Sequence, residues 1–118
     1  MKGELIFEGE YIDGKKNGKG KEYYYHDKLK FEGEYINGER NVKGKEYFNN
    51  GHLKFEGEYL NGEKNGKVKK YFWTNYYYSK NECQLIFEGE YLNNYIIKGK
   101  EYYKSGKLKF EGDYIFNN

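Results

Sequence analysis

The sequence predicts an all-β protein, an antiparallel β-meander of about nine strands. Three observations predict it. A five-residue motif, Phe-Glu-Gly-Glu-Tyr, begins at residues 7, 31, 55 and 87, and it returns at residue 110 with Asp113 in place of Glu. Apolar and charged residues alternate within the motif, as they do in a strand. Hairpin dipeptides separate the copies, and the chain contains no proline, which suits a chain whose N–H groups belong to strand ladders.

The alternation assigns the two faces of each motif strand. Within residues 29–35, the leucine, phenylalanine, glycine and tyrosine lie two apart and share one face, whereas Lys30, Glu32 and Glu34 take the other. Glycine between two aromatic positions is costly in a strand. Its return in every copy predicts that a ring from an adjoining strand lies against the backbone there.

A second element recurs between the motif strands. It reads Asn-Gly-Lys-Gly-Lys-Glu-Tyr-Tyr at residues 17–24, with variants at 41–48, 65–72 and 97–103. We therefore expect one domain, residues 1–118, built from four hairpin repeats and a terminal strand. The joints between strands contain residue types that favour turns. These dipeptides are Asp13-Gly14, Asn37-Gly38 and Asn61-Gly62 on one side, and Asn50-Gly51, Ser105-Gly106 and, less distinctively, His26-Asp27 on the other.

The charged face is expected to be a solvated surface of neutralised charge. In an antiparallel hairpin, Glu32 and Glu34 can lie beside Lys43 and Lys45 of the next strand, and such pairs each contribute a few tenths of a kcal/mol. A phosphate-binding stripe is the alternative. It would require lysines without carboxylates beside them.

Composition narrows the class of protein. The chain is 36% hydrophobic, 34% charged and 21% aromatic, with a net charge of +2. The aromatic residues argue against disorder, and the balanced charge disfavours nucleic acid as a partner. The single cysteine, Cys83, fits a reducing compartment. No signal peptide or membrane span is recognisable, so we expect a cytoplasmic protein.

Catalysis finds little support in the sequence, and we expect no enzyme, no metal site and no cofactor. His26 and His52 fall in expected turns, without a second His or a Cys nearby that could complete a metal site. Cys83 follows Glu82, whose charge disfavours a reactive thiolate. The glycines lack the strand–loop–helix context of a phosphate-binding loop.

These two elements together resemble the MORN repeat (membrane occupation and recognition nexus), and the resemblance covers nearly the whole chain. They are most similar to the variant class common in bacteria and described as antitoxin-like. The resemblance implies an elongated single-layer β-meander that serves as a scaffold or binding surface, in some cases at membranes or phosphoinositides. Three departures bear on local register: Val68 replaces a motif glycine, Asn94 replaces a turn glycine, and the fourth repeat is one residue short.

An insertion within residues 72–86 lengthens the third repeat and predicts a longer hairpin that turns near residues 79–82. It is the non-repeating part of the chain and holds its single Trp and single Cys. The insertion also contains tyrosines, and Trp and Tyr are enriched at binding hot spots. The alternative is that they cover the sheet as part of the core. The candidate partner-binding residues are those of the insertion and of the repeated aromatic face: Trp73, Tyr76, Tyr77, Tyr78, Phe31, Tyr35, Phe55 and Tyr59.

Three classes of function remain. The first is a non-enzymatic protein-binding module, which includes an antitoxin, immunity or inhibitor protein that occludes another macromolecule. The second is a membrane-surface or phosphoinositide-associated scaffold, a class that rests on the resemblance and that the small net charge disfavours. The third is a nucleic-acid-binding protein, which would need basic residues around the exposed aromatic rings. The expected partner is another protein, with a second copy of the chain as a further option.

Overall fold

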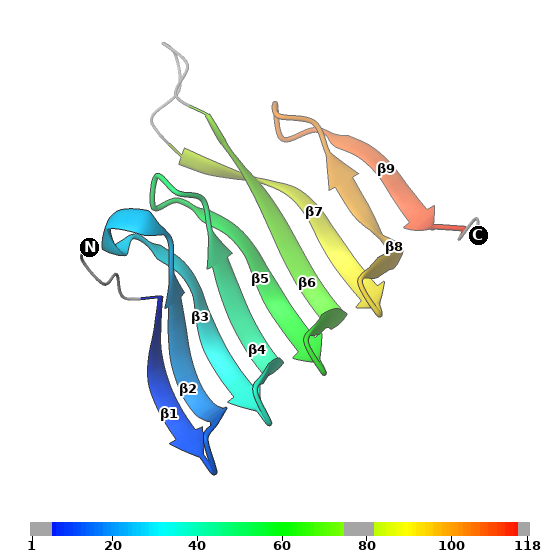
Figure 1. The fold of residues 1–118 in the computed structure, drawn as a ribbon. Helices are drawn as coiled ribbons and strands as arrows, with labels where there is room; N and C mark the ends of the chain where they lie inside the picture. Colours follow the sequence, from blue (N-terminus) through cyan, green and yellow to red (C-terminus); the bar gives the residue numbers. More distant parts are fainter. Residues whose placement is uncertain (1–5, 75–81, 116–118) are drawn as a thin grey trace.

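A computed structural model describes residues 6–74 and 82–115, and in this part of the chain nine strands form one antiparallel sheet in the order β1 to β9. Figure 1 shows a single layer of strands, each curved along its length. A one-turn 3-10 helix at Tyr25–Asp27 joins β2 to β3. The strands are β1 (Phe7–Ile12), β2 (Lys15–Tyr23), β3 (Leu29–Ile36), β4 (Glu39–Tyr47), β5 (Leu53–Leu60), β6 (Glu63–Thr74), β7 (Glu82–Leu92), β8 (Tyr95–Tyr102) and β9 (Leu108–Asp113). The predicted all-β meander is confirmed.

The turns along one edge of the sheet are tight two-residue turns with positive φ at both central residues. The φ values are +50° and +88° for Asn37 and Gly38, and +45° and +70° for Asn93 and Asn94. This is the backbone of a type I′ hairpin, which asparagine and glycine adopt at low cost. Asn94 therefore keeps the turn that glycine makes in the earlier repeats.

The turns of the second, third and fourth repeats are also tied to the repeat before them. The N–H of Gly38 donates to the carbonyl of Lys16, and the N–H of Gly62 donates to that of Arg40, over 2.8 and 2.9 Å. The N–H of Asn94 makes the equivalent bond to the carbonyl of Lys64 at 2.9 Å. Contacts of this kind join each repeat to its neighbour, as in other repeat proteins.

One glycine from almost every strand lies in a single row that crosses the whole sheet. Successive members are directly opposite one another in the register of the strands. The row consists of Gly9, Gly20, Gly33, Gly44, Gly57, Gly89, Gly99 and Gly112, with Val68 in the β6 position. Val68 faces Gly57 on one side and Gly89 on the other, so its substitution leaves the register unchanged.

The core is a ladder of aromatic rings on one face of the glycine row. Phe31 and Tyr35 would lie about 13 Å apart along a flat strand, yet their ring centroids are 5.8 Å apart and edge to face. The rings lean over Gly33, where a β-carbon would stand 2.9 Å from Phe31 Cζ. The same contact joins neighbouring repeats, because Phe31 also meets Tyr59 at 5.5 Å. The expectation that glycine makes room for a ring is confirmed, but the expected source of the ring is wrong at Gly33, where the ring belongs to Phe31 of the same strand.

This packing closes the apolar face, which a flat single sheet would leave open. The buried hydrophobic residues are the aromatic rings of the three interior motif strands together with the valine of the glycine row: Phe31, Tyr35, Phe55, Tyr59, Val68, Phe87 and Tyr91. Rings at the two ends of the ladder lack one neighbour, so Tyr11 and Phe110 are 53% and 41% exposed. The core is thus a linear array without a centre.

Cationic side chains pack on the aromatic rings of the core, and Arg40 also binds a carboxylate. Arg40 lies over the Phe31 ring at 3.9 Å, and Lys16 and Lys64 lie over the equivalent Phe rings at 4.3 and 4.2 Å. The Arg40 guanidinium also binds both carboxylate oxygens of Glu22, at 2.9 and 3.1 Å. Burial raises the pKa of the Glu22 carboxyl, but hydrogen bonds from Arg40 and Tyr35 outweigh it, so the net shift of that pKa is downward. The ionised form is therefore favoured in the folded state.

The insertion extends the hairpin of β6 and β7, the two longest strands. Thr74 still pairs with Glu82, so both strands continue past the length found in the other repeats. The expected lengthening is confirmed, but the expected turn at residues 79–82 is wrong at its end, because Glu82 already belongs to β7. Residues 75–81, on which most of the expected turn falls, lie outside the described residues.

Candidate binding surface

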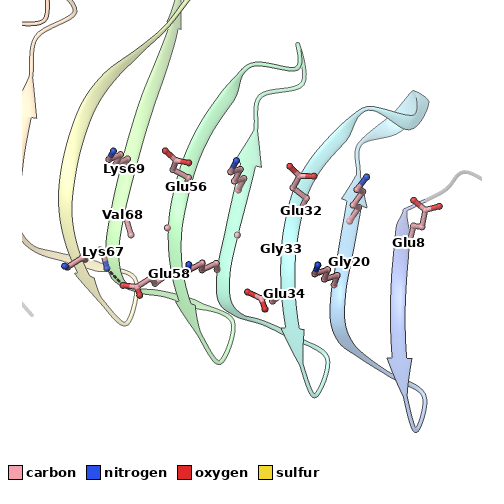
Figure 2. A pocket seen from close by; sticks show the side chains of 16 residues that line it. Glu8, Gly20, Glu32, Gly33, Glu34, Glu56, Glu58, Lys67, Val68 and Lys69 are labelled. Atoms are coloured by element: carbon pink, nitrogen blue, oxygen red, sulfur yellow. Dashed lines mark hydrogen bonds between the residues drawn. The ribbon is translucent and has the colours of Figure 1, made fainter.

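The face opposite the aromatic ladder carries a long, open trough, which we call the charged trough. Its volume is about 910 Å³, and it crosses β1 to β6. Figure 2 shows two rows of charged side chains with the glycine row between them. One wall consists of Glu8, Lys21, Glu32, Lys45, Glu56 and Lys69, and the other of Lys19, Glu34, Lys43, Glu58 and Lys67. The floor is backbone, because the residues of the glycine row have their side-chain positions on the opposite, aromatic face.

The charges form stripes of alternating sign. Both walls carry carboxylates where they cross β3 and lysines where they cross β4, and this order repeats on β5 and β6. Neighbouring strands are about 4.8 Å apart, so the sign changes at that interval along the trough. Six lysines and five glutamates line the trough. The net charge of the trough is therefore small, although positive and negative charges are separated into distinct stripes.

Tyrosine hydroxyls hold the carboxylates of one wall. The Tyr47 hydroxyl donates to Glu32 Oε1 at 2.7 Å, and that of Tyr71 donates to Glu56 Oε1 at 2.6 Å. Burial, followed by the adjacent carboxylate, raises the pKa of both phenols. The phenols therefore remain hydrogen-bond donors well into the alkaline range.

The expectation of mutual Glu–Lys neutralisation is correct for the register of Glu32, wrong for the register of Glu34 and wrong for direct contact. Glu32 lies opposite Lys45, but a bulge places Glu34 opposite Asn41 instead of Lys43. Among the described residues on this face, ion pairs within 4 Å are Lys98 with Glu90 and Lys100 with Glu111, both outside the charged trough. The carboxylates that bind tyrosine are held in place, and the six exposed trough lysines keep their ammonium groups in solvent.

The tyrosine–carboxylate pairs were not predicted from the sequence, although a signal was present. In the first three repeats a tyrosine follows the first glutamate of the motif at a separation of 15 residues, and in the fourth the separation is 14. The pairs join two strands of one hairpin. To predict these pairs from the sequence, one must know which residues of the two strands lie opposite one another, and the bulges shift that register.

Beside the charged trough, near the turns, lies an exposed aliphatic row. It has one member from each of the first four motif strands, directly after the motif tyrosine, and these residues are 43–58% exposed. The aliphatic row consists of Ile12, Ile36, Leu60 and Leu92. Because Ile36 lies two residues after Glu34 along β3, it shares the face of the charged trough. The aliphatic row is therefore a candidate contact surface for a partner.

The structure separates the residues that the sequence indicated as partner-binding. Phe31, Tyr35, Phe55 and Tyr59 are between 0 and 4% exposed, so they belong to the core and offer almost no surface to a partner. Trp73 stacks on His52 with ring centroids 5.1 Å apart. Its Nε1 is buried and has no hydrogen-bond partner among the described residues. Tyr76, Tyr77 and Tyr78 lie outside the described residues. The candidate partner-binding residues are therefore divided between the core and the long hairpin.

Within residues 6–74 and 82–115, no group of three or more His, Cys, Asp or Glu side chains is arranged to hold a metal ion. In the same residues, no helix is long and apolar enough to cross a membrane. Cys83 donates its Sγ–H to the carbonyl of Leu53 at 3.1 Å, and burial raises the pKa of its thiol. A raised thiol pKa disfavours the reactive thiolate.

The fold and this surface define a class: a β-hairpin repeat protein in which one face forms the core and the other is left free. The family model of the MORN repeat matches residues 7–25, 31–53 and 55–67. The chain is therefore a MORN-repeat protein, and MORN repeats are generally protein- or membrane-lipid-binding modules. No curated protein matches the sequence.

Proposed function

We propose that this chain is a non-enzymatic protein-binding module that holds its partner in the charged trough and against the aliphatic row. The observation that carries the proposal is their position on one face, away from the aromatic core. An aliphatic row beside a patterned charged surface matches the composition of protein interfaces, which combine apolar contact with polar complementarity.

The charge pattern favours a protein over the alternative partners. An anionic membrane or a nucleic acid attracts clustered basic residues. In the charged trough, each stripe of lysines lies beside stripes of glutamates, so a continuous anionic surface would meet as much repulsion as attraction. A protein surface can carry charges of both signs at matching positions.

The orientation of the carboxylates supports a specific complex. Tyrosine hydroxyls fix Glu32 and Glu56, so little side-chain entropy remains to be lost there on binding. Such a surface suits a protein that occludes another macromolecule, as an antitoxin, immunity or inhibitor protein does. We place the function in this group and, because the free thiol of Cys83 fits a reducing compartment, in the cytoplasm.

The test requires a partner isolated from the native host by the tagged chain and then purified. Its affinity is compared for the wild type, for Lys43→Glu/Lys67→Glu and for Ile36→Ser/Leu60→Ser. The control is Lys28→Glu/Lys107→Glu, which makes the same change of charge at exposed residues of the connecting loops. We expect each of the first two variants to lose at least about tenfold in affinity, with the control unchanged.

Two results would contradict the proposal. One is an equal loss for the control and the trough variant, which would show a nonspecific response to charge. The other is binding of the wild type to vesicles of phosphatidylcholine and phosphatidylserine, or to oligonucleotides, at moderate salt, with no protein partner recovered. That result would assign the surface to one of the alternative classes.

A further inference from the structure

The outer edge of β9 has no neighbouring strand in the described part of the chain. Interior motif strands differ from β9 in this respect. β3, for example, pairs with β2 on one side and β4 on the other, and both of these neighbours present lysines on either side of a glycine. β9 pairs with β8 alone. It therefore lacks half of the arrangement that β3 possesses.

The missing neighbour leaves the carboxylates of β9 with lysines on one side and leaves its phenylalanine partly exposed. Lys100 approaches Glu111 at 3.9 Å, and Lys98 lies opposite Asp113, both from the β8 side. No lysine lies on the other side of these carboxylates within the described residues. Phe110 is 41% exposed, whereas Phe31, the equivalent residue in an interior strand, is fully buried.

We propose that the outer edge of β9 binds an antiparallel strand from another polypeptide in which lysine or arginine residues flank a glycine. Unpaired N–H and C=O groups of an edge strand can accept an added strand, and the side chains decide which strand is accepted. Here Glu111 and Asp113 would face the two basic residues, as Glu32 faces Lys21 and Lys45 within the sheet. The glycine would lie opposite Gly112 and extend the glycine row.

A second copy of the chain does not satisfy this requirement through the same edge. Two copies of β9 can pair antiparallel about a two-fold axis with Gly112 opposite Gly112. This register places Glu111 opposite Asp113 of the second copy, and it does so twice. Like charges directly opposite one another destabilise a sheet. The edge therefore selects a basic strand and rejects its own copy.

Two variants and one mixture make this electrostatic selection testable without a known partner. In Glu111→Lys, the two-fold register places the introduced lysine opposite Asp113 of the second copy at both positions, so the repulsion becomes attraction. In Glu111→Lys/Asp113→Lys, every facing pair is basic and repulsive again. A mixture of the double variant with the wild type, however, pairs lysine with carboxylate at both positions and reproduces the proposed complex.

The experiment measures association by analytical ultracentrifugation at low and high salt, after circular dichroism has shown that all three proteins are folded. We expect the wild type and the double variant to self-associate at least about tenfold more weakly than Glu111→Lys. The mixture should form a heterodimer that weakens at high salt. A carbodiimide cross-link between position 111 of one copy and position 113 of the other should locate the contact on β9.

The proposal is overturned if the wild type associates through β9 as strongly as Glu111→Lys, or if the mixture stays monomeric. A heterodimer without the cross-link between residues 111 and 113 would also overturn it, because the contact would then lie elsewhere. The charged trough is not altered in any of these proteins. A failure here would therefore leave the proposed function standing, and the reverse also holds.

Discussion

The ring of Phe31 lies against the backbone of Gly44 on the neighbouring strand, and the Arg40 guanidinium lies over the same ring, 3.9 Å from its centroid. This relationship explains how a single-layer sheet can have a dry core. The ring replaces the side chain that glycine lacks, so the sheet buries its aromatic residues against itself. The opposite face is then available for binding.

Replacement of Gly33 by valine should destabilise the protein by about 2 kcal/mol or more, because a new side chain would be forced into a packed site. A β-carbon at this position would stand 2.7 Å from Gly44 Cα, which is backbone and cannot move aside, and 2.9 Å from Phe31 Cζ. Urea unfolding measures the effect. Glu34→Val, one residue further along the strand on the charged face, is the control and should cost less than about 1 kcal/mol. Equal losses would show that the two faces are assigned incorrectly.

Replacement of Val42 by glycine should stabilise the protein by up to about 1 kcal/mol. Val42 adopts a φ of +66° where the equivalent Gly18 and Gly66 have +99° and +102°. The left-handed region costs a non-glycine residue about 1–2 kcal/mol, and this strain outweighs the greater freedom that glycine has in the unfolded chain. The reverse substitution, Gly66→Val, should destabilise. If Val42→Gly lowers the unfolding midpoint, the conformation at this bulge is not strained.

Stability should fall steeply above about pH 10, the ordinary pKa of tyrosine. Burial and adjacent carboxylates raise the pKa values of Tyr35, Tyr47, Tyr59 and Tyr71 in the folded protein. The folded pKa lies above the unfolded one, so the stabilisation is complete below the unfolded pKa and is lost as the pH rises through the folded pKa.

Urea unfolding at a series of alkaline pH values, together with tyrosinate absorbance, measures this dependence. Tyr71→Phe removes one such phenol and should give a shallower decline. Ionisation of all tyrosines near pH 10 in a protein that remains folded would be the opposite result.

The long hairpin should contribute to recognition of the partner. In the test, residues 74–82 are replaced by a short Asn-Gly turn, in the spacing of the second repeat. If the hairpin is a recognition element, the shortened protein stays folded and loses affinity for its partner. If it unfolds, Trp73 and its neighbours serve the core. Unchanged stability with unchanged binding would refute both roles and would leave the charged trough and the aliphatic row to account for binding.

The sequence was sufficient to predict the strands, the turns and the inward face, because each depends on local chemistry that recurs. Asn37-Gly38 favours positive φ wherever it occurs, and the alternation around Gly33 assigns a face without knowledge of neighbours. Recurrence also exposed the insertion, since it breaks the period.

The candidate site was less predictable, because it depends on register. Glu34 was expected beside Lys43, but the bulge at Val42 moves it opposite Asn41. The residue at the bulge is valine, so its backbone conformation could not be read from residue type. Four of the aromatic residues chosen as binding residues, Phe31, Tyr35, Phe55 and Tyr59, lie in the core instead.

The two faces of the sheet are divided between folding and binding, and β5 offers a matched pair that tests this division. Phe55 is 1% exposed on the aromatic face, and Leu60 is 47% exposed in the aliphatic row. The measurement is the free energy of unfolding in urea of Phe55→Ala and of Leu60→Ala. We predict a loss of about 3–5 kcal/mol for Phe55→Ala, or complete unfolding, and less than about 1 kcal/mol for Leu60→Ala. A loss for Leu60→Ala as large as that for Phe55→Ala would contradict the division, because the aliphatic row would then belong to the core.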